Sequence, residues 1–319
     1  MALLTIDNVT KRYGDFTAVD RVAFEAQPGR ILGLLGPNGA GKTSTIRMIA
    51  YITAPDEGQI LFDGRDVGPW SQEQMGYLPE ERGLYKKLKV AEQLRYLAEL
   101  KGLSRADATQ KIRYWLERFG MLEWAGKKTQ ELSKGMQQKI QFIATILPEP
   151  RLIILDEPFS GLDPINAELL REIILELKDA DRTILFASHR MEQVEQLCDD
   201  ICLISKGQIL VKGPLREVKR SFGRDTIILE FDGDDAFLDA FEAQGHIRIS
   251  NRSSHRVELR LLDGAPSRPI LEAALAHTDD VYRFERVEPP LSEIFISVVT
   301  EQQGQAAVEN VAAAPLEVA

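Results

Sequence analysis

The segment Gly36-Pro37-Asn38-Gly39-Ala40-Gly41-Lys42-Thr43 decides the fold of this 319-residue chain. It has the pattern Gly-x-x-x-x-Gly-Lys-Ser/Thr, whose glycines let successive backbone N–H groups turn toward phosphate oxygens. Lys42 can reach the β and γ phosphates, and the Thr43 hydroxyl can bind Mg²⁺. The apolar residues 31–35 predict a buried strand before the loop. Residues 43–50 predict a helix after it, whose N-terminus favours anions. Strand, loop and helix in this order predict nucleotide binding.

The composition is that of an ordinary globular protein, with 44% hydrophobic and 28% charged residues. No run of 18 apolar residues suggests a membrane span, and the first residues do not resemble a signal peptide. The spacing of Cys198 and Cys202 on an apolar stretch favours buried thiols over a disulfide or a metal site. We therefore expect a cytoplasmic protein. The net charge of −10 argues against a general nucleic-acid binder, although it leaves room for a local basic patch.

The order of predicted elements indicates an α/β core with an insertion. The short apolar runs 31–35, 152–155 and 183–187 predict buried parallel strands, the last two joined by a helix near 164–179. Residues 3–9, 18–26 and 58–63 predict short strands with turn residues between them. Helical spacing of apolar residues across about 83–147 predicts a helical insertion.

A second domain is predicted from residue 216 to 302. Strands near 226–231, 246–250, 255–262 and 281–287 alternate with helices near 235–244 and 268–277, and a last helix follows near 291–300. The order β-α-β-β-α-β is typical of a small α+β domain of the ferredoxin-like type. Residues 303–319 are rich in Ala, Val, Glu and Gln, which predicts a disordered tail.

Two carboxylates end the predicted strand 152–155. Asp156 can hold Mg²⁺, directly or through water. Glu157 can activate a water molecule as a general base. Alone, such a pair is equally well explained by solvated acids at a strand end. Beside a phosphate-binding loop, it predicts the metal and water chemistry of nucleotide hydrolysis.

Ser133, in the segment Leu132–Gln138, is a candidate helix N-cap. A serine hydroxyl with a glycine, here Gly135, at a helix N-terminus also suits an anion. From these residues alone, a simple helix cap is the better explanation. Asp163 before Pro164 likewise reads as an N-cap with proline at the first helical position.

His189 and Glu80 are weaker candidates when taken singly. A histidine at a strand end is more often structural, but His189 follows the strand expected beside the one that ends at Asp156, within plausible reach of a γ-phosphate. Glu80, in Tyr77–Glu80 at the entry to the helical insertion, would ordinarily be a solvated acid.

Taken together and in this order, the motifs resemble the ATP-binding subunit of ABC transporters over about residues 3–215. The resemblance implies an α/β P-loop NTPase fold, with a RecA-like core, an antiparallel β subdomain and a helical insertion, and it implies ATP and Mg²⁺ as cofactors. It assigns Mg²⁺ contacts to Thr43, Glu80 and Asp156, and hydrolysis to Glu157, His189 and Lys42. The ATP-binding residues that it implies are Tyr13, Gly36, Pro37, Asn38, Gly39, Ala40, Gly41, Lys42, Thr43 and Ser44. Tyr13, assigned to stack on adenine, also fits an ordinary aromatic at a strand end.

Two motifs depart from the usual pattern of the family. Glu80 stands where the family usually has Gln. A carboxylate can still ligate Mg²⁺, but its charge changes how this segment responds to the metal. The signature segment, Leu132–Gln138, reads Leu-Ser-Lys-Gly-Met where Leu-Ser-Gly-Gly-Gln is usual, so that Lys134 and Met136 differ. These variants, with residues 81–85 and a small C-terminal domain, look most like the ABC-2-type export subunits of the sodium-efflux and multidrug group.

The resemblance further implies a dimer in which ATP lies between the loop of one subunit and the signature segment of the other. The residues that it assigns to act on the partner's ATP are Ser133, Lys134, Gly135, Met136 and Gln137. Asp163 is assigned to communication across the dimer. We expect a homodimer, or a pair with a second ATPase subunit, and a separate membrane permease that docks near the helical insertion and holds the chain at the inner face of the cell membrane.

Two other readings compete with an exporter subunit. A soluble ABC-type ATPase acting on ribosomes or DNA usually has two such domains, coiled coils or zinc modules, and this sequence shows none of these patterns. A nucleotide-sensing adaptor that has lost hydrolysis is disfavoured by Glu157 and His189. We therefore expect no nucleic-acid partner. Cargo selection in this family lies mainly in the permease.

Overall fold

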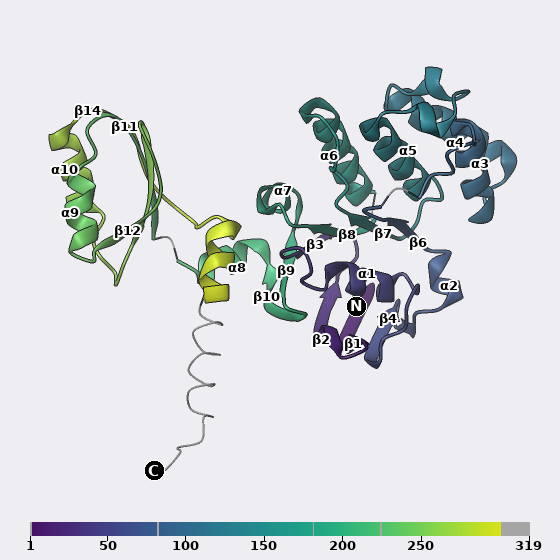
Figure 1. Cartoon of the computed structure of the whole chain (residues 1–319), viewed down its shortest axis with the longest axis horizontal. Coiled ribbons are helices and arrows are strands. Elements are labelled where there is room, and N and C mark those ends of the chain that lie inside the picture. Colours follow the sequence, from purple (N-terminus) through teal and green to yellow (C-terminus); the bar gives the residue numbers. More distant parts are fainter. Residues whose placement is uncertain (1, 82, 181, 224, 301–319) are drawn as a thin grey trace, which may run out of the picture. The chain divides into compact units, whose positions relative to one another are not determined.

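The chain divides into two units, Met1–Leu215 and Arg216–Ala319 (Figure 1). The computed structural model describes residues 2–300, apart from 82, 181 and 224. The tail predicted at 303–319 lies outside the described residues. None of the helices among the described residues is long and apolar enough to cross a membrane.

A six-stranded sheet forms the centre of the first unit, in the order β10-β9-β3-β8-β7-β6. Its predicted strands are β3 (Ile31–Leu35), β7 (Leu152–Asp156) and β8 (Thr183–Ser188), parallel to one another and buried along their whole length. Helix α6 (Pro164–Asp179) connects β7 to β8, as predicted. The prediction missed strands β6 (Met75–Leu78), β9 (Asp200–Ser205) and β10 (Gln208–Pro214). Because β3, β7 and β8 are parallel neighbours, their carboxyl ends share one edge of the sheet.

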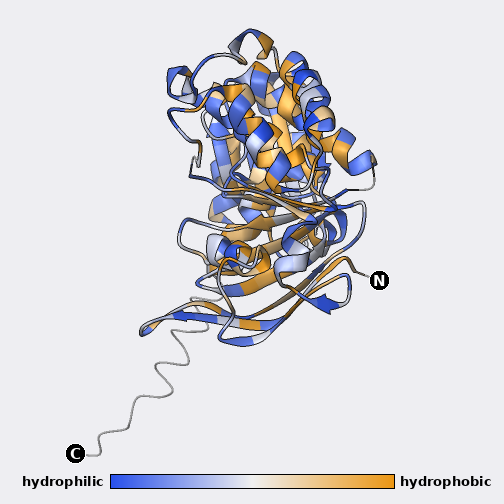
Figure 2. Cartoon of the chain, turned by 90° about the vertical axis from the view of Figure 1, so that its right-hand side faces the viewer, coloured by the Kyte–Doolittle hydropathy of each residue, from blue (hydrophilic) through white to orange (hydrophobic). Residues whose placement is uncertain are grey.

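An antiparallel sheet of order β2-β1-β4-β5 packs below the central sheet in the view of Figure 1. Its strands are β1 (Leu4–Tyr13), β2 (Phe16–Ala26), β4 (Glu57–Phe62) and β5 (Arg65–Asp66). Helix α1 (Lys42–Ile49) contributes Ile46, Met48 and Ile49 to the apolar core shared with both sheets. Figure 2 shows the hydrophobic residues gathered on the strands and on the inner helix faces.

The first strand was predicted too short, as residues 3–9. Strand β1 continues to Tyr13 past an irregularity at Asn8, which has a φ of 46° and lies where the pairing register with β2 shifts. Such a bulge breaks the two-residue alternation on which a strand prediction depends. The hairpin that closes between Tyr13 and Phe16 therefore reaches farther than expected.

The predicted helical insertion consists of α3 (Val90–Leu100), α4 (Arg105–Arg118) and α5 (Lys134–Ile146). Two short 3-10 helices, η1 (Leu122–Trp124) and η2 (Thr129–Glu131), precede α5. The apolar residues that bury their side chains between these helices include Leu94, Ala98, Ile112, Leu116, Ile140 and Ile143. Leu100 fits the same helical spacing but is 65% exposed, because it is the last residue of α3.

The short helices α2 (Pro69–Gln72) and α7 (Met191–Leu197) complete the first unit, with α7 packed against β3 and β8. Helix α8 (Leu215–Ser221) begins at the boundary between the units. The two cysteines are buried free thiols, as predicted, with Cys198 at the end of α7 and Cys202 in β9.

The second unit has the predicted order β-α-β-β-α-β. Its elements are β11 (Thr226–Gly233), α9 (Phe237–Ala243), β12 (Ile247–Ser253), β13 (Arg256–Leu261), α10 (Arg268–His277) and β14 (Thr278–Val287). The antiparallel sheet has the order β12-β13-β11-β14, which is the ferredoxin-like arrangement. Helices α9 and α10 cover one face over an apolar core of its own. Residues 291–300 are helical, as predicted.

Candidate functional site

The loop Gly36–Thr43 connects β3 to α1, as its sequence predicts. At Gly36 the backbone has a φ of 153°, and a Cβ there would lie 2.1 Å from the carbonyl oxygen of Ile204 in β9. Only glycine permits this close approach, because any side chain would collide with backbone. The neighbouring strand therefore holds the loop against the carboxyl end of the central sheet.

Lys42 is folded back onto its own loop and is only 7% exposed. Its Nζ donates to the carbonyl oxygens of Gly36 at 2.7 Å and of Pro37 at 3.1 Å. Burial lowers the pKa of Lys42, while the nearby carboxylates of Glu157 and Asp156 oppose that shift. A cation that has lost much of its water in this way is ready to exchange carbonyl oxygens for phosphate oxygens.

Asp156 ends β7 and is 1% exposed. Its Oδ2 accepts a hydrogen bond from the Thr43 hydroxyl at 3.3 Å. Burial raises the pKa of Asp156 to about 6, and the charges of Glu80 and Glu157 act in the same direction against the Thr43 hydrogen bond. Buried carboxylates that repel one another favour a bound cation.

Mg²⁺ fits this donor set. In an octahedral shell with bonds of about 2.0–2.1 Å, neighbouring oxygen ligands lie about 3 Å apart, close to the separation of the Thr43 and Asp156 oxygens. Among the described residues, no group of three or more His, Cys, Asp or Glu side chains is arranged to hold a metal by itself. In proteins, Mg²⁺ usually keeps several of its waters and is bound by one or two carboxylates together with substrate phosphates.

Glu157 directly follows β7 and has a φ of 50°, a left-handed conformation that costs a non-glycine residue about 1–2 kcal/mol. Its carboxylate is held at three points. The Ser188 hydroxyl donates to Oε2 at 3.0 Å, the His189 backbone N–H donates to Oε1 at 2.8 Å, and His189 Nδ1 lies 2.6 Å from Oε1. With the proton on Nδ1, the imidazole donates to Glu157 and leaves Nε2 as an acceptor.

The prediction identified Glu157 and His189 but missed Ser188, the last residue of β8, which is fully buried. Register explains how these residues meet. Asp156 pairs with Ala187 across the parallel strands, so that Glu157 lies beside Ser188 and His189. A serine at the end of a buried strand gives no sequence signal of this contact.

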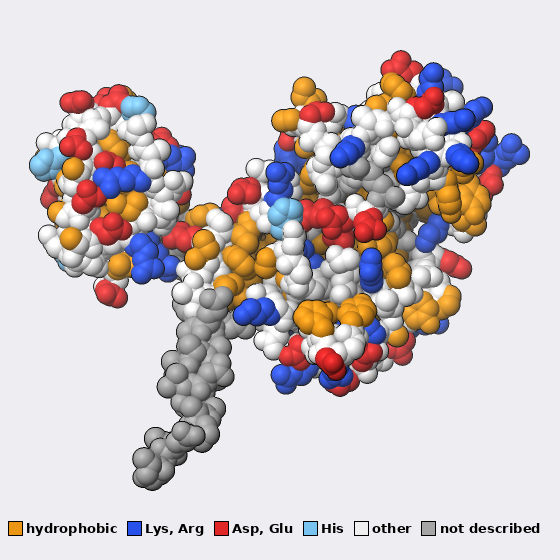
Figure 3. Space-filling view, viewed as in Figure 1, with side chains coloured by type: hydrophobic (Ala, Val, Ile, Leu, Met, Phe, Trp, Pro, Cys, Tyr) orange, Lys and Arg blue, Asp and Glu red, His pale blue; other side chains and the backbone are white. Residues whose placement is uncertain are grey.

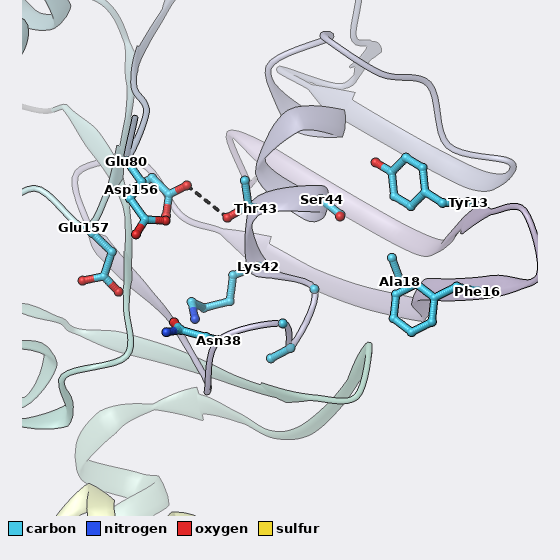
Figure 4. A pocket seen from close by; sticks show the side chains of 13 residues that line it. Tyr13, Phe16, Ala18, Asn38, Lys42, Thr43, Ser44, Glu80, Asp156 and Glu157 are labelled. Carbon is cyan, nitrogen blue, oxygen red and sulfur yellow. Dashed lines mark hydrogen bonds between the residues drawn. The ribbon is translucent and has the colours of Figure 1, made fainter. Parts of the chain in front are cut away.

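The pocket above the loop has a volume of about 360 Å³ and lies within the size range of small-molecule sites. Figure 4 shows Glu80, Asp156 and Glu157 on one side and Tyr13, Phe16 and Ala18 on the other, with Lys42 and Thr43 between them. The lining residues from the loop and α1 are Asn38, Gly39, Ala40, Gly41, Lys42, Thr43 and Ser44.

The aromatic side of this pocket holds more than the predicted Tyr13. Phe16 starts β2 on the other side of the same hairpin and is 64% exposed, and Ala18 lies two residues farther along. Phe16 and Ala18 were missed, although a turn flanked by two aromatic residues was visible in the sequence. An exposed ring that lines a pocket is suited to stacking on a planar base.

Ser133–Gln137, of the signature segment, are not among the residues that line the pocket. Ser133 is the N-cap of α5, and its Oγ accepts from the backbone N–H of Met136 at 3.3 Å. Lys134 is exposed, and a Cβ on Gly135 would lie 3.0 Å from the carbonyl oxygen of Gly161. The start of α5 therefore lies against the segment that follows Glu157.

Two further hydrogen bonds stabilise the starts of helices α5 and α6. The Gln137 amide donates to the carbonyl oxygen of Leu132 at 3.1 Å, which braces the start of α5. Asp163 caps α6 as predicted, with Oδ1 accepting from the Asn166 N–H at 3.0 Å. A second hollow of about 320 Å³ is lined by Ser160, Gly161 and Leu162. It shares Glu80 and Glu157 with the pocket above the loop and also has His189 in its wall.

Comparison with protein-family models matches residues 19–160 to "ABC transporter" and residues 213–299 to "ATP-binding protein DrrA1-3-like, C-terminal domain". The second match covers the ferredoxin-like unit.

Curated relatives match over most of their length. The uncharacterized ABC transporter ATP-binding protein YhaQ of Bacillus subtilis (strain 168) is 47% identical over 93% of this chain and 98% of its own. The linearmycin resistance ATP-binding protein LnrL of the same organism is 32% identical over 93% of this chain and 98% of its own. The ABC transporter ATP-binding protein NatA, also of Bacillus subtilis (strain 168), is 36% identical over 69% of this chain and 92% of its own.

Among solved structures, the ATP-binding subunit of an ABC transporter superposes with a TM-score of 0.66 at 33% identity, over 69% of this chain and 93% of that one. A nucleotide-free ATP-binding cassette from an ABC transporter has a TM-score of 0.59 at 26% identity, over 67% of this chain and 92% of that one. These matches agree with the phosphate-binding loop, the carboxylates at the end of β7 and the capped helix α5. The chain belongs to the ATP-binding subunits of ABC transporters, in the group of ABC-2-type exporter ATPases.

Proposed function

We propose that this ATPase is the energy-coupling subunit of an exporter, in which ATP-driven closure of two subunits moves a separate membrane permease. The observation that carries the proposal is the division of the site. One chain supplies the phosphate loop and the acidic residues, while its Ser133–Gln137 lie outside the pocket lining. The names of two relatives, a linearmycin resistance protein and a Nod factor export protein of Cupriavidus metallidurans, support export.

Each group at the pocket has a defined task in this proposal. Lys42 leaves the carbonyl oxygens of Gly36 and Pro37 and binds the β and γ phosphates. Thr43 and Asp156, with Glu80 beside them, would hold Mg²⁺, and the metal would supply positive charge opposite the transferred phosphoryl group. Glu157 takes the proton of the attacking water. His189 keeps the Glu157 carboxylate in place through its backbone N–H and its Nδ1.

An electrostatic argument supports the proposed dimer. A γ-phosphate carries more charge than one loop can enclose, and the N-terminus of a second helix completes the enclosure. Helix α5 presents such an end, with exposed Ser133 and Lys134 at its first turn. In this proposal Asp163, which caps α6, passes the state of one site to the other.

A groove of about 290 Å³ between β6 and the helical insertion is our candidate for the permease contact. Its apolar lining includes Leu84, Leu97 and Leu100, and Lys101 reaches in from the end of α3. The groove also contains Pro79, directly before Glu80. A permease element seated there would be linked through one peptide bond to a residue of the ATP pocket.

Glu157→Gln tests the hydrolytic role. We expect ATP binding to remain and turnover to fall at least ~100-fold, the lower range for losing a general base. The measurement is the single-turnover rate, together with the nucleotide Kd. Near-normal turnover in this variant would remove Glu157 from the role.

Ser133→Ala tests the shared site. It removes a helix cap and a candidate phosphate contact together, so a second capping serine serves as the matched control. Ser104 caps α4, accepting from the Asp107 N–H at 3.1 Å, and lies outside the pocket lining. We expect ATP-dependent dimerisation to fall in Ser133→Ala but not in Ser104→Ala, with nucleotide binding by the monomer intact in both. Equal loss of monomer binding in Ser133→Ala would contradict the shared site.

The partner is tested by isolation of the full chain from its membranes under mild detergent. Copurification of one integral-membrane protein is the expected result, and loss of that complex in Leu84→Asp would place the contact in the groove. Recovery with ribosomes or DNA instead would favour a soluble ATPase of the same family.

A further inference from the structure

The charge of this chain is unevenly distributed. Residues 83–147 contain 13 lysines and arginines against six aspartates and glutamates, a net charge of +7. The whole chain carries −10, so the rest of it carries −17. Figure 3 shows blue side chains gathered over the helices of the insertion. Positive charge is therefore concentrated on one part of an acidic protein.

Backbone pairing brings five of these lysines together. Lys89 and Lys128 face each other in an antiparallel bridge. The Val90 N–H donates to the Lys127 carbonyl at 2.9 Å, and the Gln130 N–H donates to the Lys86 carbonyl at 3.2 Å. The lysine cluster consists of Lys86, Lys87, Lys89, Lys127 and Lys128, all of them exposed.

Two carboxylates lie at the cluster, because Glu92 accepts a hydrogen bond from the Lys89 backbone N–H and Glu131 accepts one from that of Lys128. Within the described part of the chain, none of its five lysines forms an ion pair with an Asp or Glu side chain. Like charges directly opposite one another, as Lys89 and Lys128 are, destabilise a strand pair. The exposed ammonium groups are therefore available to an external anion.

We propose that the lysine cluster is a contact surface for the anionic phospholipid headgroups of the membrane that holds the permease. This inference rests on the proposed function, because it takes the position of the permease from the candidate groove. The candidate permease groove is lined by Gly83 and Leu84, and the cluster begins two residues later at Lys86. Because a permease is embedded in the bilayer, the residues that flank its docking groove face the membrane surface.

The chemistry of the cluster favours a lipid surface over a structured phosphate ligand. It contains lysines only, which are mobile point charges, and lacks the arginine forks that read phosphates bidentately. Tyr85 and Tyr96 lie beside it as an edge-to-face pair with ring centroids 6.1 Å apart, 53% and 46% exposed. Exposed tyrosines with lysines are typical of the headgroup level of a membrane.

The test compares vesicle binding of the full chain with that of Lys86→Gln/Lys87→Gln/Lys127→Gln/Lys128→Gln. Vesicles of phosphatidylglycerol mixed with phosphatidylcholine, or of phosphatidylcholine alone, are sedimented with the protein in the absence of permease. We expect binding only with phosphatidylglycerol, weakened by salt. Each lysine near such a surface contributes a factor of about five, so the variant is expected to bind at least about a hundredfold more weakly at low ionic strength.

The matched control removes four exposed positive charges elsewhere, as Arg105→Gln/Arg113→Gln/Lys206→Gln/Arg248→Gln, and should bind nearly as well as the parent chain. ATPase activity and thermal stability should be unchanged or higher in the cluster variant, which excludes misfolding as the cause. Binding that ignores phosphatidylglycerol, equal losses in both variants, or retention of RNA without retention of vesicles would each overturn the inference. Permease copurification is measured on the same variants. If the cluster variant keeps its permease but loses vesicle binding, or if neither variant depends on lipid while the permease complex is intact, the proposed transporter function still stands.

Discussion

At the scale of single residues, the site depends on backbone conformations that most residues avoid. Gly36 approaches Ile204 too closely for a side chain, and Glu157 holds a left-handed φ of 50°. The three hydrogen bonds from Ser188 and His189 offset the cost at Glu157. Strain of this kind persists where the surroundings over-determine a conformation, as they do at functional sites.

Gly36→Ala is expected to lower the free energy of unfolding by at least about 2 kcal/mol and to abolish ATP binding, because Cβ would force the loop off β9. Gly39→Ala is the matched control. Its φ of 78° is also left-handed, but no atom lies within 4 Å of the added Cβ, so only about 1 kcal/mol is expected. Urea unfolding of the nucleotide-free protein measures both. Equal destabilisation would contradict the close contact.

The pKa of Asp156 predicts a pH dependence of the nucleotide-free protein. Because its folded value of about 6 lies above the ordinary value of 3.8, the folded state holds the proton more tightly, and stability falls as the pH rises from about 3.8 through 6. Asp156→Asn should therefore raise the free energy of unfolding by about 1–3 kcal/mol at pH 7 to 8, with little effect near pH 4. Denaturation without Mg²⁺ across this range provides the measurement. A variant less stable than the parent at pH 8 would contradict the sign.

At the scale of elements, the β1–β2 hairpin forms the aromatic wall of the pocket. Strand β1 continues past the irregularity near Asn8, and the turn at its end places Tyr13 and Phe16 on the same hairpin, where both line the pocket. The more exposed ring is Phe16, at 64% against 46% for Tyr13. The element thus offers two rings to a base, where a single aromatic was expected.

Alanine substitution can identify the ring that stacks on the base. Loss of one stacking ring should weaken nucleotide binding by about 1–3 kcal/mol, or roughly 5- to 150-fold in Kd. We expect this loss in Phe16→Ala or Tyr13→Ala, measured by titration with ATP. Tyr114→Ala, at a 53% exposed ring on α4, is the control and should bind normally. Normal affinity in both hairpin variants would remove the stacking role from this hairpin.

At the scale of the whole molecule, every residue that lines the ATP pocket belongs to the first unit, and the second unit has its own apolar core. A chain ending at residue 222, after α8, should therefore fold and bind ATP with an affinity near that of the full protein. Circular dichroism and nucleotide titration test this. If ATP binding is lost although the fragment folds, the second unit contributes to the site. A change in dimerisation alone would instead assign that unit to subunit contact.

The sequence by itself determined the local features of this protein. The glycine-lysine loop, the buried runs that became β3, β7 and β8, and the helix caps at Ser133 and Asp163 depend on near neighbours in the chain, so their spacing suffices to predict them. The β-α-β-β-α-β order of the second unit was readable for the same reason. Fold class and ATP chemistry followed from these features.

The tertiary structure alone decided which distant residues meet. Parallel register placed Ser188 beside Glu157, and the pairing of β1 with β2 placed Phe16 with Tyr13 in the pocket wall. Pairing of two loops about 40 residues apart opposed Lys89 to Lys128. Contacts of this kind depend on register and crossing of elements, which are set by packing of the whole core rather than by local propensity, and no short sequence pattern records them.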